Sequence, residues 1–236
     1  MEHKNTVIHW FRQDLRLTDN PALFAATKGQ KVLPIYILDD VNSKEHMMGS
    51  ASRWWLHKSL ENLTNDLDGN LGVYAGNPEE VLNKLISKYN IKKIYWNRCY
   101  EPWRIKRDKG LKVSLESKGV EVNTYNGSLL WEPWEINKSD GTPYKVFTPY
   151  YKKGCLNAPA PRDPLPKVII ETTFSDADNE TKLEDLKLLP KINWYEGMEN
   201  NWVPGEEGAE VKIDSFISNG LLDYKEGRNF PAKKNV

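Results

Sequence analysis

Several side chains able to bind a planar or charged ligand stand directly after apolar stretches of the sequence. Arg12 follows Trp10-Phe11, Asp39-Asp40 follows a second apolar stretch, and Arg53 comes soon after. A guanidinium such as that of Arg53 presents a planar fork to a carboxylate, a phosphate or a ring carbonyl. The nine tryptophans and eleven tyrosines fit either planar ligands or a well-filled core. These residue types therefore indicate a site that binds a ligand.

Motifs of covalent and metal-dependent catalysis are missing from the sequence. It contains no glycine-rich phosphate loop, no GxSxG elbow and no HExxH pair. The four histidines are scattered, and His9 lies within an apolar stretch, where a core role is expected. Cys99 and Cys155 are too few for a disulfide framework or a structural zinc site. The residue types thus indicate an open α/β domain with a ligand site at its strand ends.

Strands and helices are expected to alternate through the first 125 residues. The expected strands cover residues 6–10, 32–38, 71–75, 91–96 and 120–125, and the expected helices begin near residues 20, 50, 77 and 101. The strands are apolar throughout rather than alternating in polarity, which favours a parallel sheet covered on both faces. Such sheets bind ligands at the carboxyl ends of their strands. Pro34 is unusual in a central strand and predicts an irregular edge there.

Three segments follow from this pattern. Residues 1–127 are predicted to form a five-stranded parallel Rossmann-like α/β sheet with helices on both faces. Prolines recur after Gly127 and periodicity is lost, which predicts a long irregular connector over residues 128–203. Apolar residues return at helical spacing between Gly205 and Tyr224. Residues 204–236 are therefore expected to form a short helix at the start of a further domain.

Composition excludes several classes of protein. Lys plus Arg and Asp plus Glu number 33 each, so the whole chain has no nucleic-acid character by net charge. No apolar run approaches the ~18 residues of a membrane helix, which predicts no membrane partner. The first residues lack the apolar stretch of a signal peptide, and cysteines are few. A reducing, cytoplasmic location is expected.

Four stretches resemble the DNA photolyase/cryptochrome family. They are residues 10–20 (WFRQDLRLTDN), residues 96–103 (WNRCYEPW) with Arg107-Asp108, residues 145–151 (KVFTPYY), and residues 204–206 (PGE) with Gly220-Leu221, Tyr224 and residues 228–231 (RNFP). Four motifs in order across the chain are more specific than any one alone. The resemblance implies an α/β antenna domain, a connector and a helical FAD domain, of which the sequence holds only the beginning.

The resemblance also implies ligand-binding residues. It assigns the antenna chromophore to Phe11, Arg12, Asp39, Arg53, Glu101 and Trp103. Tyr224 matches a position that contacts FAD, and Arg228 one near the DNA phosphates. Some folate-using relatives carry Asn-Glu where this sequence has Trp103-Arg104. The antenna is therefore left open among methenyltetrahydrofolate, a deazaflavin, a flavin, or none.

The function implied by the resemblance is that of a deoxyribodipyrimidine photo-lyase, a carbon–carbon lyase that repairs pyrimidine dimers in UV-damaged DNA. In the family reaction the antenna passes light energy to reduced FAD, which donates an electron to a flipped-out dimer. The chain is then expected to be the antenna-binding portion, inactive without the missing FAD domain. The alternatives are a cryptochrome-like blue-light sensory or interaction module without repair activity, and a generic nucleotide-binding α/β domain.

Overall fold

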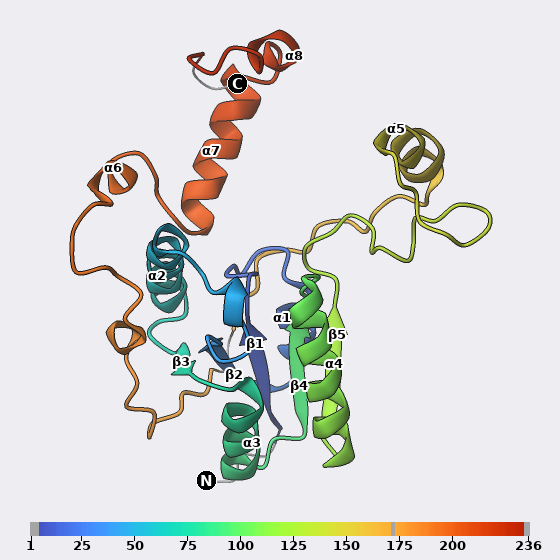
Figure 1. Cartoon of the computed structure of the whole chain (residues 1–236). Helices are drawn as coiled ribbons and strands as arrows, with labels where there is room; N and C mark the ends of the chain where they lie inside the picture. The colour runs from blue at the N-terminus through green and yellow to red at the C-terminus, as the bar shows by residue number, and fades with distance from the viewer. Residues whose placement is uncertain (1–4, 171–172, 234–236) are drawn as a thin grey trace.

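A single five-stranded parallel sheet forms the centre of the computed structural model, which describes residues 5–170 and 173–233 (Figure 1). The strands are β1 (Thr6–Phe11), β2 (Lys31–Leu38), β3 (Gly72–Ala75), β4 (Lys93–Asn97) and β5 (Glu121–Tyr125). Their spatial order is β3-β2-β1-β4-β5, and every pairing is parallel. The prediction of a parallel Rossmann-like sheet is confirmed. The order reverses at β1, and at such a point the connections diverge and leave room for a ligand.

Four helices connect these strands, and local sequence explains where they begin. They are α1 (Pro21–Ala26), α2 (Ser50–Asp66), α3 (Pro78–Tyr89) and α4 (Pro102–Ser117). The side chains of Asn20 and Asn77 accept hydrogen bonds from first-turn N–H groups, and proline follows each of them. Helix α2 instead follows Gly49 without a side-chain cap, so neither Ser50 nor Ser52, the two serines that sequence alone suggests as caps, has that role.

The helices cover both faces of the sheet. On one face, Leu23 of α1 and Leu60 of α2 pack with Phe11 in one buried cluster. On the other, Leu82 of α3 and Leu111 of α4 belong to a second cluster. Burial of one such side chain contributes about 1.5–3 kcal/mol relative to exposure. These two cores hold the strand ends in place. Helices on both faces of the sheet confirm the predicted arrangement.

Pro34 lies in an interior strand rather than an edge strand, which corrects part of the expectation. Strand β2 has β1 on one side and β3 on the other, and Pro34 is paired in register with His9 of β1. The pairing of β2 with β3 begins only at Ile35. Pro34 therefore sits where β2 has a strand on one side only, so its missing N–H costs no ladder hydrogen bond on the other side.

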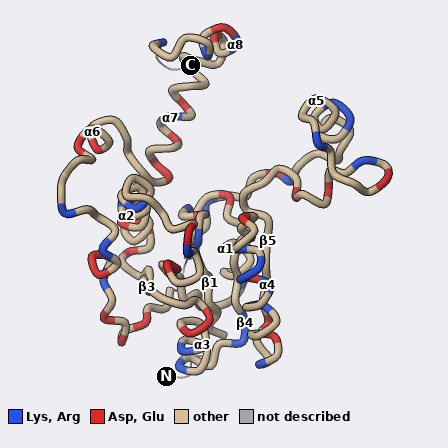
Figure 2. Tube along the Cα trace, in the orientation of Figure 1, with Lys and Arg blue, Asp and Glu red and all other residues tan. Residues whose placement is uncertain are grey.

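The connector is irregular but contains short turns of helix. These are α5 (Phe147–Pro149), η2 (Tyr150–Gly154), η3 (Cys155–Asn157), η4 (Leu183–Leu186) and α6 (Glu196–Glu199); a further turn, η1 (Lys44–His46), follows β2. Residues 128–160 form an arm that leaves the sheet after β5, with α5 near its tip (Figure 1). The chain then returns along the sheet, where Phe174 donates its N–H to the carbonyl of Val32. Acidic side chains recur along this returning part (Figure 2).

The last elements are α7 (Glu206–Asn219) and α8 (Tyr224–Gly227). Helix α7 ends earlier than the predicted stretch to Tyr224, because the chain turns at Gly220. It projects from the end of the domain at which the strands finish (Figure 1). Its apolar residues Ile213 and Ile217 are 56% and 55% exposed. Within residues 5–170 and 173–233, no helix is both long and apolar enough to cross a membrane. The three-segment division stays a prediction.

Candidate chromophore site

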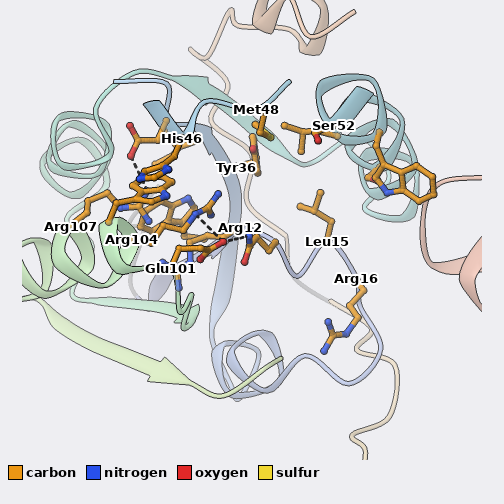
Figure 3. Close-up of a pocket in the computed structure, with 18 of the residues that line it drawn as sticks. Arg12, Leu15, Arg16, Tyr36, His46, Met48, Ser52, Glu101, Arg104 and Arg107 are labelled. Carbon is orange, nitrogen blue, oxygen red and sulfur yellow. Dashed lines mark hydrogen bonds and ion pairs between the residues drawn. The ribbon is translucent and has the colours of Figure 1, made fainter. Parts of the chain in front are cut away.

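A cavity of about 920 Å³ opens where β1 and β2 end. The loop after β1, the beginning of α4, one side of α2 and the first turn of α7 supply its walls (Figure 3). Its lining comprises Trp10, Arg12, Gln13, Leu15, Arg16, Tyr36, Ile37, Asp39, His46, Met48, Ser52, Trp55, Leu56, Ser59, Glu101, Pro102, Trp103, Arg104, Arg107, Gly205, Glu206 and Ala209. The cavity lies at the reversal of strand order, as the parallel topology predicts.

The loop after β1 carries Arg12 inward. The backbone N–H of Arg12 donates to Asp14 Oδ1 at 2.9 Å, which turns the chain immediately after the strand. Its guanidinium donates to the Asp108 carboxylate and to the backbone carbonyl of Asn97, and the residue is only 5% exposed. Asn97 also donates to Asp14 Oδ2 at 2.5 Å. This buried network fixes the floor of the cavity between β1 and β4.

Asp39 is held by the protein itself. Its Oδ2 accepts from Arg107 Nη1 at 2.8 Å, and its Oδ1 accepts from the backbone N–H of Asn42 at 2.9 Å. Arg107 Nη2 also pairs with Asp108 Oδ1 at 2.7 Å. Burial acts to lower the pKa of Arg107, but Asp108 and Asp39 outweigh it and raise that pKa above its ordinary value. The three side chains form one ion-paired wall of the cavity.

Aromatic rings and cations face one another in the same wall. Arg104 and Arg107 both lie over the Trp103 ring, with 4.8 and 5.3 Å between guanidinium carbon and ring centroid. Arg107 also lies 5.2 Å from the ring centroid of Trp10. Such contacts attract each cation to the face of the ring. The wall therefore combines aromatic rings with guanidinium groups.

Four residues of the lining carry buried polar atoms without hydrogen-bond partners. Among the described residues these include Trp10 Nε1, Arg12 Nε, Glu101 Oε2 and Arg104 Nε, all from residues of the lining. Glu101 Oε1 accepts from Gln13 Nε2 at 2.6 Å and lies 3.6 Å from Arg104 Nε, an ion pair without a hydrogen bond. A buried unpaired polar group costs about 1–3 kcal/mol.

The structure brings together four of the six residues expected to bind an antenna. Arg12, Asp39, Glu101 and Trp103 line the cavity. Phe11 does not, because alternation along β1 sends its side chain to the opposite core, where it is fully buried. Arg53 does not line it either, because its guanidinium pairs with Asp40 Oδ2 at 2.7 Å and donates to the carbonyl of Met48.

Tyr224 and Arg228 lie next to each other, away from this cavity. The Arg228 guanidinium lies 5.6 Å from the centroid of the Tyr224 ring, and Tyr224 is 42% exposed. Neither residue lines the large cavity. Their roles toward FAD and DNA therefore stay predictions.

Sequence reasoning missed three contributors to the cavity. Arg104 and Arg107 follow Trp103 by one and four residues, a spacing that places Arg107 beside Trp103 on the helix and was a usable signal. Glu206 lies about 190 residues from the loop it touches, and helical periodicity carries no information about that approach.

The chain is similar to photolyases and cryptochromes along nearly its whole length. The family model for DNA photolyase matches residues 7–168. A deoxyribodipyrimidine photo-lyase of Agrobacterium fabrum is 40% identical over 96% of this chain, and cryptochrome-2 of Arabidopsis thaliana is 33% identical over 94% of it. The crystal structure of a bacterial class III photolyase from Agrobacterium tumefaciens superposes with a TM-score of 0.89 at 37% identity, covering 98% of this chain.

These similarities concern only part of each relative. The chain spans 48% of the Agrobacterium fabrum enzyme, 37% of the Arabidopsis cryptochrome and 48% of the Agrobacterium tumefaciens structure. A cryptochrome structure from Synechocystis matches with a TM-score of 0.79 at 25% identity, again over half of that chain. The matched half contains the sheet and the cavity.

Proposed function

Because the chain belongs to the DNA photolyase family, we propose that it binds an antenna chromophore in the cavity at the carboxyl end of its sheet. In this role it is the light-harvesting portion of a deoxyribodipyrimidine photo-lyase. The observation that carries the proposal is the set of buried, unpaired polar atoms of Trp10, Arg12, Glu101 and Arg104 around a cavity with aromatic walls.

The residues present fit a flat heteroaromatic ring. The rings of Trp103 and Trp55 line the cavity, and aromatic pairs prefer offset or edge-on contact at about 4.5–7 Å between centroids. Glu101 Oε2 accepts from a ring N–H, while Arg104 Nε donates to a ring nitrogen or carbonyl. Methenyltetrahydrofolate, a deazaflavin and a flavin all carry such groups, so the cavity is compatible with each.

Other expected residues act indirectly in this proposal. Arg12 contributes its unpaired Nε while its other nitrogens hold the floor. Asp39 orients Arg107, and Arg53 fixes Asp40 at the rim. Phe11 supports β1 from the opposite core.

Repair of UV-damaged DNA also needs FAD, which in the family supplies the electron that splits the dimer. In this chain Tyr224 is proposed to contact FAD and Arg228 the DNA phosphates, once a helical FAD domain surrounds them. A guanidinium pairs well with phosphate oxygens. Both side chains are exposed, and preorganisation of a binding site is lost when most of its walls are absent. The chain alone is therefore expected not to repair dimers under blue light, and repair by the purified chain would contradict this.

An absorption titration tests the antenna proposal. Methenyltetrahydrofolate, FMN and a deazaflavin are each added to the purified chain, and a saturable, red-shifted band is expected for at least one. Glu101→Gln should weaken that binding by about tenfold, because an amide donor replaces one of the two carboxylate acceptors. Glu80→Gln, an exposed carboxylate in the first turn of α3, is the matched control and should change nothing.

Two results would count against the proposal. One is the absence of a saturable band with all three chromophores, and the other is equal weakening by both variants. The cryptochrome alternative is separated by assaying dimer repair with the full-length gene product, since a cryptochrome-like module has no such activity.

A further inference from the structure

The first turn of α7 lies against the loop that follows β1. The Glu206 carboxylate accepts from the backbone N–H of Leu17 at 3.0 Å through Oε2, and from that of Thr18 at 2.8 Å through Oε1. The carboxylate therefore binds two successive backbone amides with both oxygens. Charge-assisted hydrogen bonds of this kind are about twice as strong as neutral ones.

Asn62 ties the same turn to α2. Asn62 Nδ2 donates to the carbonyl of Pro204. Gly205 has φ of +108°, and a side chain on it would place Cβ 2.7 Å from Asn62 Nδ2. Only glycine fits this bend, which brings Glu206 to the loop directly after the contact with α2.

The first turn of α7 also lines the cavity. Gly205, Glu206 and Ala209 line it together with Glu101, the N-cap of α4, and Trp103 of α4. Leu15 and Arg16, from the loop that Glu206 binds, line it as well (Figure 3). The position of α7 therefore determines whether the cavity is closed on this side.

We propose that Glu206 is a positioning residue whose carboxylate holds α7 on the loop after β1, so that α7 becomes a wall of the cavity; this contact is called the latch below. Occupancy of the cavity and placement of α7 then favour each other. This coupling rests on the proposed antenna function, whereas the latch rests only on the contacts of Glu206.

The latch is expected to respond to pH. Burial acts to raise the pKa of Glu206, but the hydrogen bonds from Thr18 and Leu17 outweigh it and, with the nearby charge of Lys167, lower the pKa below its usual range. The described cations of the cavity lining are Arg12, Arg16, Arg104 and Arg107. A lowered carboxylate pKa stabilises the latched state at neutral pH, and this stabilisation is lost as the pH falls through the folded pKa.

Amide hydrogen exchange by NMR on the full chain tests the latch without any ligand. In Glu206→Gln, an NH2 group replaces one carboxylate oxygen and cannot accept from a backbone N–H. Amide exchange at Leu17, Thr18 and α7 should therefore accelerate about tenfold or more. Glu207→Gln removes an exposed carboxylate from the same turn and should leave these amides unchanged. Amides of β1 and β4 report whether the sheet stays folded.

A pH series tests the same contact in the unaltered chain. After correction for intrinsic exchange, protection of Leu17 and Thr18 in the unaltered chain should fall as the pH drops from 7 to 4, and the Glu206→Gln chain should lack this fall. Unchanged protection in Glu206→Gln, or the same acid response in both chains, would contradict the latch.

Ligand titrations test the coupling. With methenyltetrahydrofolate or FMN as the probe, binding should slow exchange in α7, and Glu206→Gln should bind several-fold more weakly than Glu207→Gln. Binding without added α7 protection would overturn the coupling and leave the antenna proposal standing. If neither probe binds, the antenna proposal fails with these probes and the coupling with it, while the ligand-free exchange still decides the latch.

Discussion

At the scale of single residues, β1 shows how one strand serves two purposes. Its side chains alternate, so Trp10 reaches the cavity while Phe11 packs in the opposite core. His9 directly precedes Trp10 in the strand, is fully buried and packs edge-on against Phe11 at 4.4 Å between ring centroids. Within the described residues, neither ring nitrogen of His9 has a hydrogen-bond partner. The prediction of a core role for His9 holds, but its polar atoms are left unsatisfied.

His9 should make stability depend on pH. Burial is the largest effect and lowers its pKa to about 4, with smaller opposing and supporting contributions from Asp14 and Arg12. The unfolded chain binds a proton near pH 6.5 and the folded chain does not, so stability is lost as the pH falls from 6.5 towards 4. The free energy of unfolding should fall by about 2–3 kcal/mol between pH 7 and 4.5. Urea unfolding at the two pH values measures it.

The matched pair for this measurement is His9→Leu and His46→Gln. His9→Leu should remove that part of the pH dependence, since no imidazole is left to protonate. His46 is exposed, so His46→Gln should retain it. An unchanged pH dependence in His9→Leu would show that the histidine is protonated in the folded state.

At the scale of elements, one carboxylate of the connector makes several contacts with the sheet domain. Asp176 accepts from Tyr74 Oη at 2.8 Å, from Lys88 Nζ at 2.6 Å and from the Tyr89 hydroxyl. Burial acts to raise the pKa of Asp176, but the hydrogen bonds from Lys88, Tyr89 and Tyr74 outweigh it and lower the pKa. A segment without regular structure is thereby held against β3 and α3.

Asp176→Ala should release this part of the connector without unfolding the sheet. Loss of a buried carboxylate with three donors corresponds to about 1–3 kcal/mol, or roughly 10- to 100-fold faster local opening. Limited proteolysis should cut near residues 173–186 correspondingly faster, while the thermal transition of the sheet changes little. Glu180→Ala, an exposed neighbour, is the control. Equal cleavage rates in the two variants would show that Asp176 does not hold the segment.

At the scale of the whole molecule, two extensions leave the sheet domain: the arm of residues 128–160 and helix α7 (Figure 1). Both expose large apolar side chains, including Phe147 at 74% on the arm and Leu222 at 98% after α7. Exposed apolar surface of this extent marks an interaction surface or promotes association. This agrees with a chain that spans about half the length of its relatives.

Ile217→Glu should therefore reduce self-association without destabilising the chain. Ile217 is 55% exposed on α7, so the expected change in unfolding free energy is within about 0.5 kcal/mol. Sedimentation velocity should show fewer associated species than in Ser218→Glu, which adds the same charge at the next position. A large loss of thermal stability in Ile217→Glu would mean that this face is packed in solution.

Much of the fold could be predicted from local sequence. Apolar stretches mark the five strands, and Asn20-Pro21 and Asn77-Pro78 mark two helix starts, because capping and periodicity depend on residues only a few positions apart. The uniform apolarity of the strands also determined that the sheet is parallel and covered on both faces. The position of the cavity followed from that topology alone.

Only the tertiary structure decided which side chains meet in the cavity. Arg53 is turned to Asp40, Asp39 is engaged by Arg107, and Glu206 reaches Leu17 and Thr18. Such pairings join residues far apart in the chain, and local patterns carry no distance between them. Their outcome depends on how burial, charge and packing balance once all elements are in place.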